Sequence, residues 1–432
     1  MYLDVGDFMK MLIKNGTVIT MDSNKDKYIV TDILIEDDTI IKIDNNISDE
    51  VDKVIDANKK IVLPGLINCH THLGMSIFRA TNDNLNLYDW LSKKIEPIED
   101  NMTDDDMYYT SLLSCIEMIK TGTTCSSDMY FGVNGTLKAL RETKVRELFS
   151  RCIVGNDEAT CDVRVNEFEE LYDKIKDDKL IKASITPHAL YSCNSDTLIK
   201  SEKLATKYNL PIHIHLSENK SEVDGVITKY GKKPVEVLND VGFLNHKLIL
   251  AHGTFISDSE IEVLKNKDVS IAHNPVSNLN LGCGIADIVK YMKNGINICL
   301  GTDGAGSGNN LNMFYHMSIV DLLQKGIYQN PEVISSYDVL KMATINGAKA
   351  LGMDDLVGSI EVGKKADIII LDLNKIETSP TPDIITQVVH NVLPENVDTT
   401  IINGEILMEN NKLLLDIIEN ELIEKLNSII NR

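Results

Sequence analysis

Two histidines separated by a single residue, His70 and His72, follow an apolar run over residues 61–67. If that run is a β-strand, side chains two positions apart lie on the same face, so both imidazoles point the same way. A neutral imidazole is the commonest protein ligand for zinc-like ions. A His-X-His pair is a short pattern, and one histidine could equally be packed in the core while the other is exposed. The pair alone therefore leaves a metal site and a structural role open.

A second group of polar residues, His213, His215 and Glu218, lies at and just after the apolar run 211–216. His215 ends this predicted strand and offers one metal ligand. Glu218 follows three residues later, as a carboxylate close enough to move protons. His213 shares the face of His215 but lies deeper, so we interpret it as a hydrogen-bonded interior residue rather than a ligand.

His252 and Asp303 end two further apolar runs, over residues 247–253 and 296–303. Taken alone, His252 could be a polar plug and Asp303 a helix N-cap. Considered together, the strand ends supply three imidazoles and a carboxylate for one ion, which suits a zinc-like or iron-like metal with an open position for water. We therefore predict one divalent metal held by four residues, with Glu218 and His252 beside it as catalytic groups. The predicted ligands are His70, His72, His215 and Asp303.

These residues must be positioned by the middle of the chain, where short apolar strands alternate with helical patterns. The predicted strands cover residues 65–70, 121–128, 147–155, 181–188, 211–216, 247–253, 269–274 and 296–303, with helices such as 104–120, 196–208 and 257–267 between them. Eight such units predict a (β/α)8 TIM-type barrel. An open doubly wound sheet is the alternative. The barrel is favoured because the polar residues fall at the carboxyl ends of strands, where such barrels build active sites.

Both ends of the chain are predicted to be β-structure. Near the start of the chain, residues 11–22 predict two strands joined by a turn at Asn15-Gly16, and residues 31–43 alternate apolar and polar residues around Asp37-Asp38. Near the other end, strands are predicted over 366–373 and 400–408, with a turn at 402–404. Asn-Gly between apolar runs is a strong hairpin signal. We expect a small composite β-sandwich domain from residues 1–63 and 360–432, including a C-terminal helix over 413–430. The catalytic barrel then spans 64–359 and ends in a helix over 336–351 capped by Ser335 or Ser336.

The composition limits the classes of partner. The chain has 432 residues, 43% of them hydrophobic, and a formal net charge of −22. The acidic balance argues against nucleic acid and anionic membranes as partners, because both need a basic surface. No apolar run approaches the roughly 20 residues that span a bilayer. The eight scattered cysteines form no Cys-X-X-Cys pair, so we expect reduced thiols in a cytoplasmic protein.

Taken jointly, the motifs make the chain similar to a known family over essentially its whole length. They are Pro64-Gly65-Leu66-Ile67-Asn68 before His70-Thr71-His72, then His215-Leu216-Ser217-Glu218, Ala251-His252, His273-Asn274-Pro275 with Ser277-Asn278, Gly301-Thr302-Asp303-Gly304 and Gly363-Lys364-Lys365-Ala366-Asp367. The chain resembles the amidohydrolase superfamily and, within it, the mononuclear aminohydrolases that deaminate 5′-methylthioadenosine and S-adenosylhomocysteine. Binuclear branches carry a lysine at the end of the fourth barrel strand, where this chain has Thr186-Pro187-His188. The resemblance therefore implies one metal ion, zinc in first place and iron or manganese as alternatives.

The same resemblance implies substrate contacts. His188 is expected to touch the substrate. Glu99, in a segment that matches this group together with Asp89-Trp90-Leu91, is expected to bind the ribose hydroxyls, although it could instead belong to a solvated acidic run. Trp90 either lines the nucleoside pocket or packs beneath it. Arg151 and Arg164 correspond to the site for the amino-acid carboxylate of S-adenosylhomocysteine, and arginine suits bidentate carboxylate recognition, but arginines are also common on surfaces.

The reaction that the resemblance implies replaces an exocyclic amine with a carbonyl and releases ammonia. Asp303 would take a proton from the attacking water, His252 would orient that water, and Glu218 would protonate ring nitrogen N1. An amidohydrolase acting on another amine or halide, such as guanine, a pyrimidine or a triazine, is the enzyme alternative, and a non-catalytic scaffold is the alternative from another class. Relatives of this kind are usually dimers or tetramers, so a homo-oligomer is expected.

Overall fold

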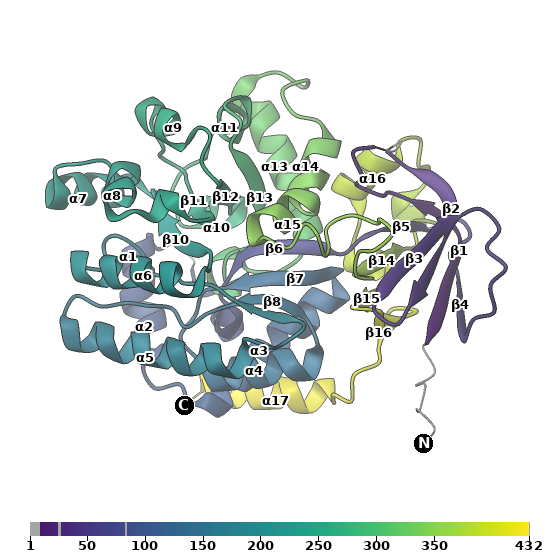
Figure 1. Cartoon of the computed structure of the whole chain (residues 1–432), viewed down its shortest axis with the longest axis horizontal. Coiled ribbons are helices and arrows are strands. Elements are labelled where there is room, and N and C mark those ends of the chain that lie inside the picture. The colour runs from purple at the N-terminus through teal and green to yellow at the C-terminus, as the bar shows by residue number, and fades with distance from the viewer. Residues whose placement is uncertain (1–8, 25–26, 83, 432) are drawn as a thin grey trace.

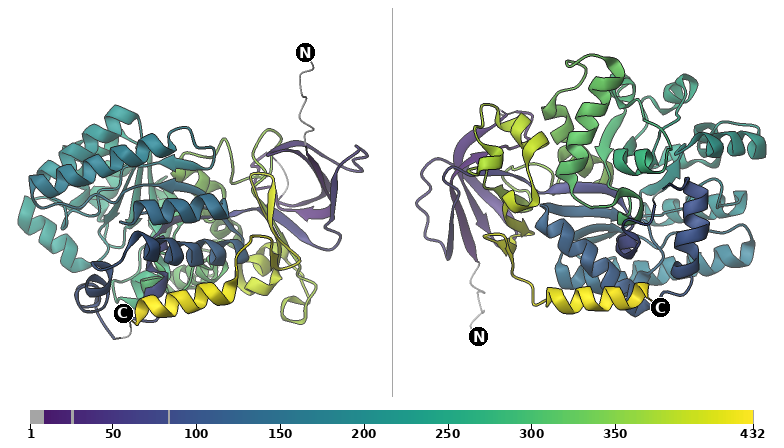
Figure 2. Two further views of the ribbon diagram at one scale, coloured as in Figure 1. Left: turned by 90° about the horizontal axis from the view of Figure 1, so that it is seen from below. Right: turned by 180° about the vertical axis from the view of Figure 1, so that it is seen from behind.

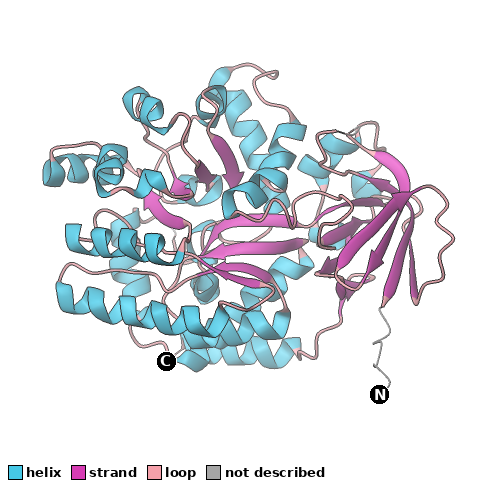
Figure 3. Ribbon diagram, in the orientation of Figure 1, coloured by secondary structure: helices cyan, strands magenta, loops and turns pink. Residues whose placement is uncertain are grey.

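The computed structural model of the chain describes residues 9–24, 27–82 and 84–431. A strand barrel wrapped by helices forms the larger part of the molecule, and a sheet built from both ends of the chain lies at one end of it (Figure 1). Figure 3 shows the same division, with helices around the barrel and mostly strands and loops in the smaller part.

Eight parallel strands form the barrel, as the alternating pattern predicted. They are β6 (Leu66–Thr71), β7 (Thr123–Asp128), β8 (Arg146–Phe149), β9 (Ile181–Ala183), β10 (Ile212–Leu216), β11 (Leu248–His252), β12 (Val269–His273) and β13 (Asn297–Leu300). Hydrogen bonding groups them into two sheets, β6-β7-β8-β9 and β10-β11-β12-β13. Backbone hydrogen bonds on both sides of Ile185 join the segment after β9 to β10, and the Asp303 N–H donates to the His70 carbonyl at 3.0 Å, between the segment after β13 and β6. The ring is therefore closed, and the open-sheet alternative is wrong.

Helices connect the strands and cover the outside of the barrel. In chain order they are η1 (Leu73–Phe78), α1 (Leu87–Trp90), η2 (Leu91–Ile95), α2 (Glu96–Glu99), α3 (Asp104–Lys120), α4 (Val133–Thr143), α5 (Glu158–Ile175), α6 (Ser195–Tyr208), α7 (Lys220–Tyr230), α8 (Pro234–Val241), η3 (Phe243–Asn245), α9 (Asp258–Leu264), α10 (Pro275–Asn280), α11 (Ile288–Lys293), α12 (Ala305–Gly308), α13 (Met313–Tyr328), α14 (Ser336–Met342) and α15 (Ile345–Leu351). The predicted helices 104–120, 196–208 and 257–267 correspond to α3, α6 and α9. Thr103 and Asp106 close a capping box at the start of α3, which explains why this boundary could be read from the sequence.

Several predicted barrel elements are shorter or broken in the structure. Strand 296–303 is observed as Asn297–Leu300, and helix 257–267 as Asp258–Leu264. Strands 147–155 and 181–188 are shorter, and their outer halves continue only as isolated pairs such as Ile153 with Pro187. Proline has no N–H to donate to a ladder. The predicted helix 336–351 is capped by Ser335 but is broken into α14 and α15, because the Ala343 carbonyl turns away to accept the Ile67 N–H of β6 at 2.8 Å.

The smaller domain is one sheet contributed by both chain ends. Its strands are β1 (Lys10–Val18), β2 (Ile29–Glu36), β3 (Thr39–Asp44), β4 (Lys53–Asp56), β5 (Ile61–Pro64), β14 (Ile368–Leu371), β15 (Val397–Ile402), β16 (Glu405–Glu409) and β17 (Lys412–Leu413). Their order is β17-β16-β15-β14-β5-β1-β2-β3, and β4 also pairs with β1. The sheet thus forks at β1 rather than forming two separate sheets, and it curls around an apolar core (Figure 2). The composite β domain is confirmed in this single-sheet form.

Two of the three expected turns in this domain are observed, and one is not. Asp37-Asp38 joins β2 to β3, and Asn403-Gly404 joins β15 to β16 with both residues at positive φ. Asn15-Gly16 lies inside the continuous strand β1, where the pairing with β2 shifts register. Asn15 has a φ of 62° and its N–H donates to Asp32, so the dipeptide forms a bulge rather than a hairpin turn.

The C-terminal helix α17 (Glu419–Ile430) is shorter than the predicted 413–430, because Leu413 pairs in β17. Its apolar side chains share a cluster with α3 of the barrel, and Lys425 forms an ion pair with Asp105 there. The helix therefore lies along the barrel (Figure 2). The division of the chain at residues 63/64 and 359/360 stays a prediction, and its residues 1–8 lie outside the described part.

A buried ion pair fastens the barrel to the β domain. Arg146, at the start of β8, donates from Nε and Nη2 to the two carboxylate oxygens of Asp367 at 2.8 and 2.9 Å, and also to Asn403 at 3.1 Å. The side chains of both partners are at most 2% exposed. In the described part of the chain, no helix has the length and apolarity needed to cross a membrane.

Candidate metal centre and active site

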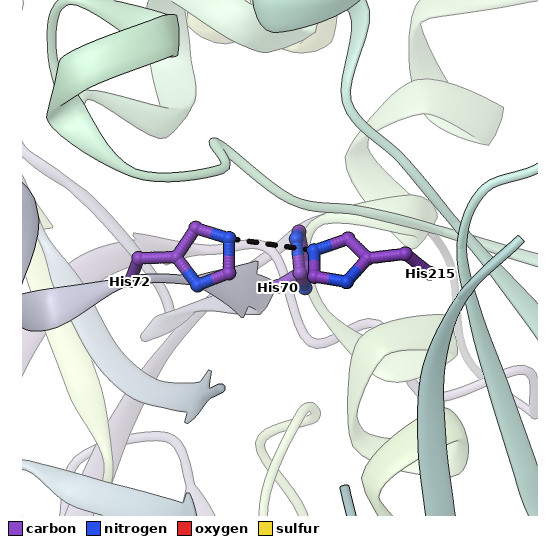
Figure 4. A group of neighbouring side chains, drawn as sticks. All are labelled: His70, His72 and His215. Atoms are coloured by element: carbon purple, nitrogen blue, oxygen red, sulfur yellow. Dashed lines mark hydrogen bonds between the residues drawn. The ribbon is translucent and has the colours of Figure 1, made fainter. Parts of the chain in front are cut away.

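The four predicted ligands meet at the carboxyl ends of β6, β10 and β13. His72 Nε2 lies 3.1 Å from Asp303 Oδ1, His70 Nε2 lies 3.7 Å from the same oxygen, and His215 Nε2 lies 3.4 Å from His72 Nε2. Figure 4 shows the rings of His70, His72 and His215 side by side, with the last of these contacts dashed. Ligand atoms of His70, His72 and His215 lie within 4.8 Å of one another, as do those of His70, His252 and Asp303. The structure therefore brings the predicted set together and adds His252 to its edge.

Each imidazole is oriented by a hydrogen bond from its other nitrogen. His72 Nδ1 donates to the Met129 carbonyl at 2.6 Å, and His215 Nδ1 donates to the His188 carbonyl at 2.8 Å. Because a carbonyl can only accept, these bonds place a proton on Nδ1 of each ring and turn Nε2 toward the cluster, where it can bind a metal. His70 Nδ1 bonds His213 Nε2 at 3.0 Å. His213 is fully buried and also contacts Ser127, which agrees with the interior role predicted for it.

The charge states of the cluster suit a cation. Burial, reinforced by the neighbouring histidines, lowers the pKa of His70 and of His215 well below the usual value, so both are neutral. Burial opposes the charge on Asp303, but its hydrogen bond with His72 and the nearby imidazoles hold its pKa well below the usual range. His70 Nε2 is buried and has no hydrogen-bond partner among the residues that the structure describes. Burial opposes a charge on His72, but its hydrogen bond with Asp303 and the charges of Asp303 and Asp128 raise its pKa. Two neutral imidazoles, a third imidazole paired with an ionised carboxylate, and the free His70 nitrogen form a donor set that suits a divalent transition metal.

Glu218 and His252 lie beside the four predicted ligands. His252 Nε2 lies 3.9 Å from Glu218 Oε2, and His252 Nδ1 donates to Asn278 Oδ1 at 2.8 Å. Burial raises the pKa of Glu218, which brings a carboxyl group closer to the range in which it can both hold and release a proton. On the other flank, the Ser277 hydroxyl donates to Asp303 Oδ2 at 2.6 Å. The motif Ser277-Asn278 thus fixes two of the proposed catalytic groups.

Three of the residues that carry or adjoin the site have left-handed backbone conformations. Ser217, His252 and Asp303 have φ values of 53°, 75° and 60°. Non-glycine residues adopt this region rarely, and the strain is tolerated where surrounding contacts over-determine it. All three positions lie at or just after a strand end, where the chain must turn sharply to aim a side chain into the mouth of the barrel.

A cavity of about 240 Å³ opens over this cluster. It is lined by His72, His215, Glu218, His252 and Asp303 at its base, and by Trp90, Glu99, His188 and mainly apolar side chains, Met75, Leu87, Leu91, Ile95, Met129, Phe131, Val154 and Leu281, elsewhere. The predicted substrate contacts Trp90, Glu99 and His188 therefore share one cavity with the catalytic groups. Trp90 lines the cavity and also packs within the protein, since it is buried and its indole N–H donates to Thr81 at 3.1 Å.

Glu99 is an integral part of the cavity wall. Burial raises its pKa, and the Tyr130 hydroxyl donates a hydrogen bond to its Oε1. A carboxylate held in this way has further lone pairs for hydroxyl donors of a ligand. His188 is uncharged, because burial lowers its pKa to about 3, and its Nδ1 contacts the Ser192 hydroxyl at 2.8 Å.

The two predicted carboxylate-binding arginines lie outside this cavity. Arg151 Nε and Arg164 Nη1 both donate to Glu167, at 2.7 and 3.0 Å. The Arg151 guanidinium lies 5.3 Å from the ring centroid of Phe131, and Phe131 lines the cavity. Among the described residues, the cavity lining includes no lysine or arginine. The Phe131 ring thus contacts Arg151 and lines the cavity, whereas neither arginine is among the lining residues.

Sequence reasoning missed several residues that shape the site. The Tyr130 hydroxyl donates to Glu99, and the Met129 carbonyl accepts from His72. Asp128 accepts the Leu73 N–H, and Glu222 accepts the Glu218 N–H. The sequence predicted Ser277 and Asn278 only as part of a family motif, without a role in the site. One local signal was available, because Asp128 and Tyr130 alternate at the end of a predicted strand as His70 and His72 do.

Comparisons with known proteins agree with this geometry. A model of the amidohydrolase family matches residues 61–407. A 5-methylthioadenosine/S-adenosylhomocysteine deaminase of Thermoanaerobacter pseudethanolicus is 43% identical over 409 residues, covering 94% of this chain and 95% of the relative. A 5′-deoxyadenosine deaminase of Methanosarcina acetivorans is 38% identical over 409 residues, with 94% of each chain covered. A solved adenosine deaminase of Xanthomonas campestris with bound zinc superposes with a TM-score of 0.94 at 28% identity, covering 98% of both chains.

Proposed function

Because the chain belongs to the amidohydrolase family, we propose that it is a metal-dependent deaminase of 5′-substituted adenosines. It converts the adenine ring of 5′-methylthioadenosine, S-adenosylhomocysteine or 5′-deoxyadenosine to the hypoxanthine ring and releases ammonia. The names of its full-length relatives at about 40% identity support this substrate class.

One observation carries the proposal. A buried group of imidazoles and one carboxylate lies at the base of a single cavity, and the same cavity holds a proton-transfer carboxyl group, Glu218, and a second carboxylate, Glu99, on its wall. The first set suits activation of water, and the second suits recognition of a polar ring and a diol. A non-catalytic scaffold has no use for this combination.

The metal is proposed to bind at His70, His72, His215 and Asp303, with zinc in first place by analogy with the zinc-bound adenosine deaminase and iron or manganese as alternatives. When bound, it acts as a Lewis acid that lowers the pKa of water to about 7. Asp303 accepts a proton from the attacking water at the carboxylate that Ser277 holds in place. His252, fixed by Asn278, orients that water.

Glu218 completes the proton transfers. Its raised pKa lets the carboxyl group deliver a proton to ring nitrogen N1 as the bond to C6 forms. The proton that Asp303 accepted from water is then passed to the exocyclic nitrogen, so that the C6–N bond breaks with ammonia as the leaving group. Glu218 recovers a proton from the C6 hydroxyl group as the carbonyl forms. Glu218 does this as a group outside the ligand set, as the non-ligand glutamate does in zinc deaminases of other folds.

Substrate positioning is assigned to the cavity walls. Glu99, held by Tyr130, accepts hydrogen bonds from the ribose hydroxyls, and Trp90 and the apolar side chains pack on the nucleoside. His188 is neutral and contacts the ring or the sugar. We further propose that Arg151 and Arg164 bind the carboxylate of S-adenosylhomocysteine. To do so, the arginines must release Glu167, and the substrate must extend past Phe131.

Two further properties are proposed rather than observed. Assembly into a dimer or tetramer follows from the family resemblance alone. A cytoplasmic location is supported by the eight cysteines, which are all free and buried, as is usual in a reducing compartment.

The test is a direct substrate screen. The metal-replete protein is incubated separately with methylthioadenosine, S-adenosylhomocysteine, 5′-deoxyadenosine and adenosine, and the shift from the adenine to the hypoxanthine absorbance band is followed. Turnover of at least one 5′-substituted adenosine is expected. Turnover of guanine, a pyrimidine or a triazine with none of the four adenosines would replace the proposed function with the alternative within the family.

A further inference from the structure

The loop that carries Glu218 is held by a second buried carboxylate. Glu222 lies in the first turn of α7, four residues after Glu218, and is 2% exposed. Its Oε2 accepts the backbone N–H of Glu218 at 2.7 Å, and its Oε1 accepts the backbone N–H of Ser217 at 3.1 Å. Both carboxylate oxygens are therefore bonded to the backbone on which the proton-transfer group is mounted.

These two N–H groups have a particular need for an acceptor. Strand β10 ends at Leu216, and Ser217 then turns into the left-handed region with a φ of 53°. Ser217 and Glu218 are buried, so an unbonded N–H here would cost about 1–3 kcal/mol. The Glu222 N–H in turn donates to Asn219 Oδ1 at 2.9 Å, which caps α7. The strained turn and the helix start thus fix each other.

Glu222 itself does not line the cavity. Its hydrogen bonds go to the loop backbone and to the helix cap. It therefore acts on the reaction through Glu218, by holding the loop that carries this residue and by placing a second acidic group near it. The Glu218 carboxyl group itself is contacted by Cys283, whose Sγ lies 3.7 Å from Glu218 Oε1.

We propose that Glu222 is a positioning residue for proton transfer, because its carboxylate braces the Ser217–Glu218 backbone and so aims Glu218 at the substrate ring. This inference rests on the role of Glu218 in the proposed function. A displacement of about 1 Å at such a group costs on the order of 100-fold in rate. Metal binding and substrate affinity depend on other residues and stay intact.

The test compares Glu222→Gln and Glu222→Ala with the matched control Asp224→Asn, an exposed position in the same helix that loses the same charge. The amide of Glu222→Gln keeps one acceptor oxygen, whereas its NH2 group faces a backbone N–H. We expect kcat to fall about 10-fold or more in Glu222→Gln and about 100-fold in Glu222→Ala. The KM should change less than about 3-fold and the metal content should equal that of wild type. Asp224→Asn should match wild type in every respect.

Two readouts separate this role from a merely structural one. In a double-mutant cycle, adding Glu222→Gln to Glu218→Gln should cause no further loss, because a group that acts through Glu218 has nothing left to position. Hydrogen exchange of the peptide spanning residues 216–223 should be faster in both Glu222 variants and unchanged in Asp224→Asn. The exchange measurement needs no substrate, so it tests the brace even if the proposed reaction is wrong.

The proposal is overturned by any of three results. These are unchanged exchange of the 216–223 peptide in Glu222→Ala, wild-type kcat in both Glu222 variants, or a loss of kcat that is proportional to lost metal. Failure of the proposed function looks different, because wild type itself would then leave all four adenosines unchanged while the exchange result stands.

Discussion

Removal of the Asp367 carboxylate should destabilise the protein without altering its chemistry. Asp367→Ala leaves the Arg146 guanidinium buried at the domain junction with only Asn403 as a side-chain partner, and it also removes the acceptor of the Asn403 N–H. Breaking a buried ion pair in this way costs about 3–5 kcal/mol. The pair lies at the start of β8, at the opposite end of the barrel strands from His72 and Asp303, so kcat measured well below the unfolding temperature should stay unchanged.

The expected shift in melting temperature follows from the size of the chain. An unfolding entropy of about 2.1 cal/mol/K per residue gives about 0.9 kcal/mol/K for 432 residues. A loss of about 3–5 kcal/mol therefore lowers Tm by about 3–6 °C, measured by differential scanning calorimetry on the metal-loaded protein.

The chain provides its own control for this measurement. Lys144 and Glu405 also join the barrel to the β domain, but their side chains are 43% and 52% exposed. Glu405→Ala should change stability by less than about 1 kcal/mol and Tm by about 1 °C at most. Replacing both buried partners, as Arg146→Met with Asp367→Leu, should recover much of the loss because no unpaired charge remains. Equal shifts in Asp367→Ala and Glu405→Ala would refute the reasoning from burial.

Three further predictions concern the active site. Glu218→Gln should keep the metal, because the residue is outside the proposed ligand set, yet lower kcat at least about 100-fold; near-normal turnover in a stopped assay would remove its proton-transfer role. Tyr130→Phe should raise the KM for adenosines with a 2′,3′-diol about 10-fold by releasing Glu99, and should leave a 2′,3′-dideoxy analogue unaffected; an equal change for both substrates would contradict the ribose assignment. Arg151→Ala should raise the KM for S-adenosylhomocysteine at least about 10-fold and leave that for methylthioadenosine unchanged; parallel effects on the two substrates would show that Arg151 serves only to hold Glu167.

The sequence was sufficient to predict the barrel and the group of metal-ligand and catalytic side chains. His70, His72, His215, His252 and Asp303 lie at or within three residues of the carboxyl end of an apolar strand, and the carboxyl ends of parallel barrel strands must converge. Periodicity within the chain therefore carried information about contacts between distant segments.

The details that the sequence did not provide depend on partners chosen by the tertiary fold. Nothing local to Asn15-Gly16 shows that Asp32 will accept the Asn15 N–H and turn an expected hairpin into a bulge. Likewise, the break between α14 and α15 exists because Ala343 bonds β6, far away in sequence. The braces of the site, such as Tyr130 on Glu99 and Ser277 on Asp303, belong to the same class.

The arginines illustrate a further limit. Their types and approximate spacing suggested a carboxylate site, but residue type does not say which carboxylate is bound. In the structure, both Arg151 and Arg164 donate hydrogen bonds to the carboxylate of Glu167. Only the three-dimensional arrangement showed that the Phe131 ring, which lines the cavity, contacts Arg151, and that neither arginine lines the cavity.

The central claim is that one divalent metal at the His and Asp cluster makes the protein a catalyst. It is tested most directly by following metal content and kcat together through a chelator titration, with elemental analysis of each sample. Activity should fall in proportion to metal from one ion per chain, and zinc should restore it in wild type but not in His72→Ala. At about 0.05 ions per chain, about 5% of the activity should remain if each ion serves one site. Full activity at or below this metal content would contradict the claim.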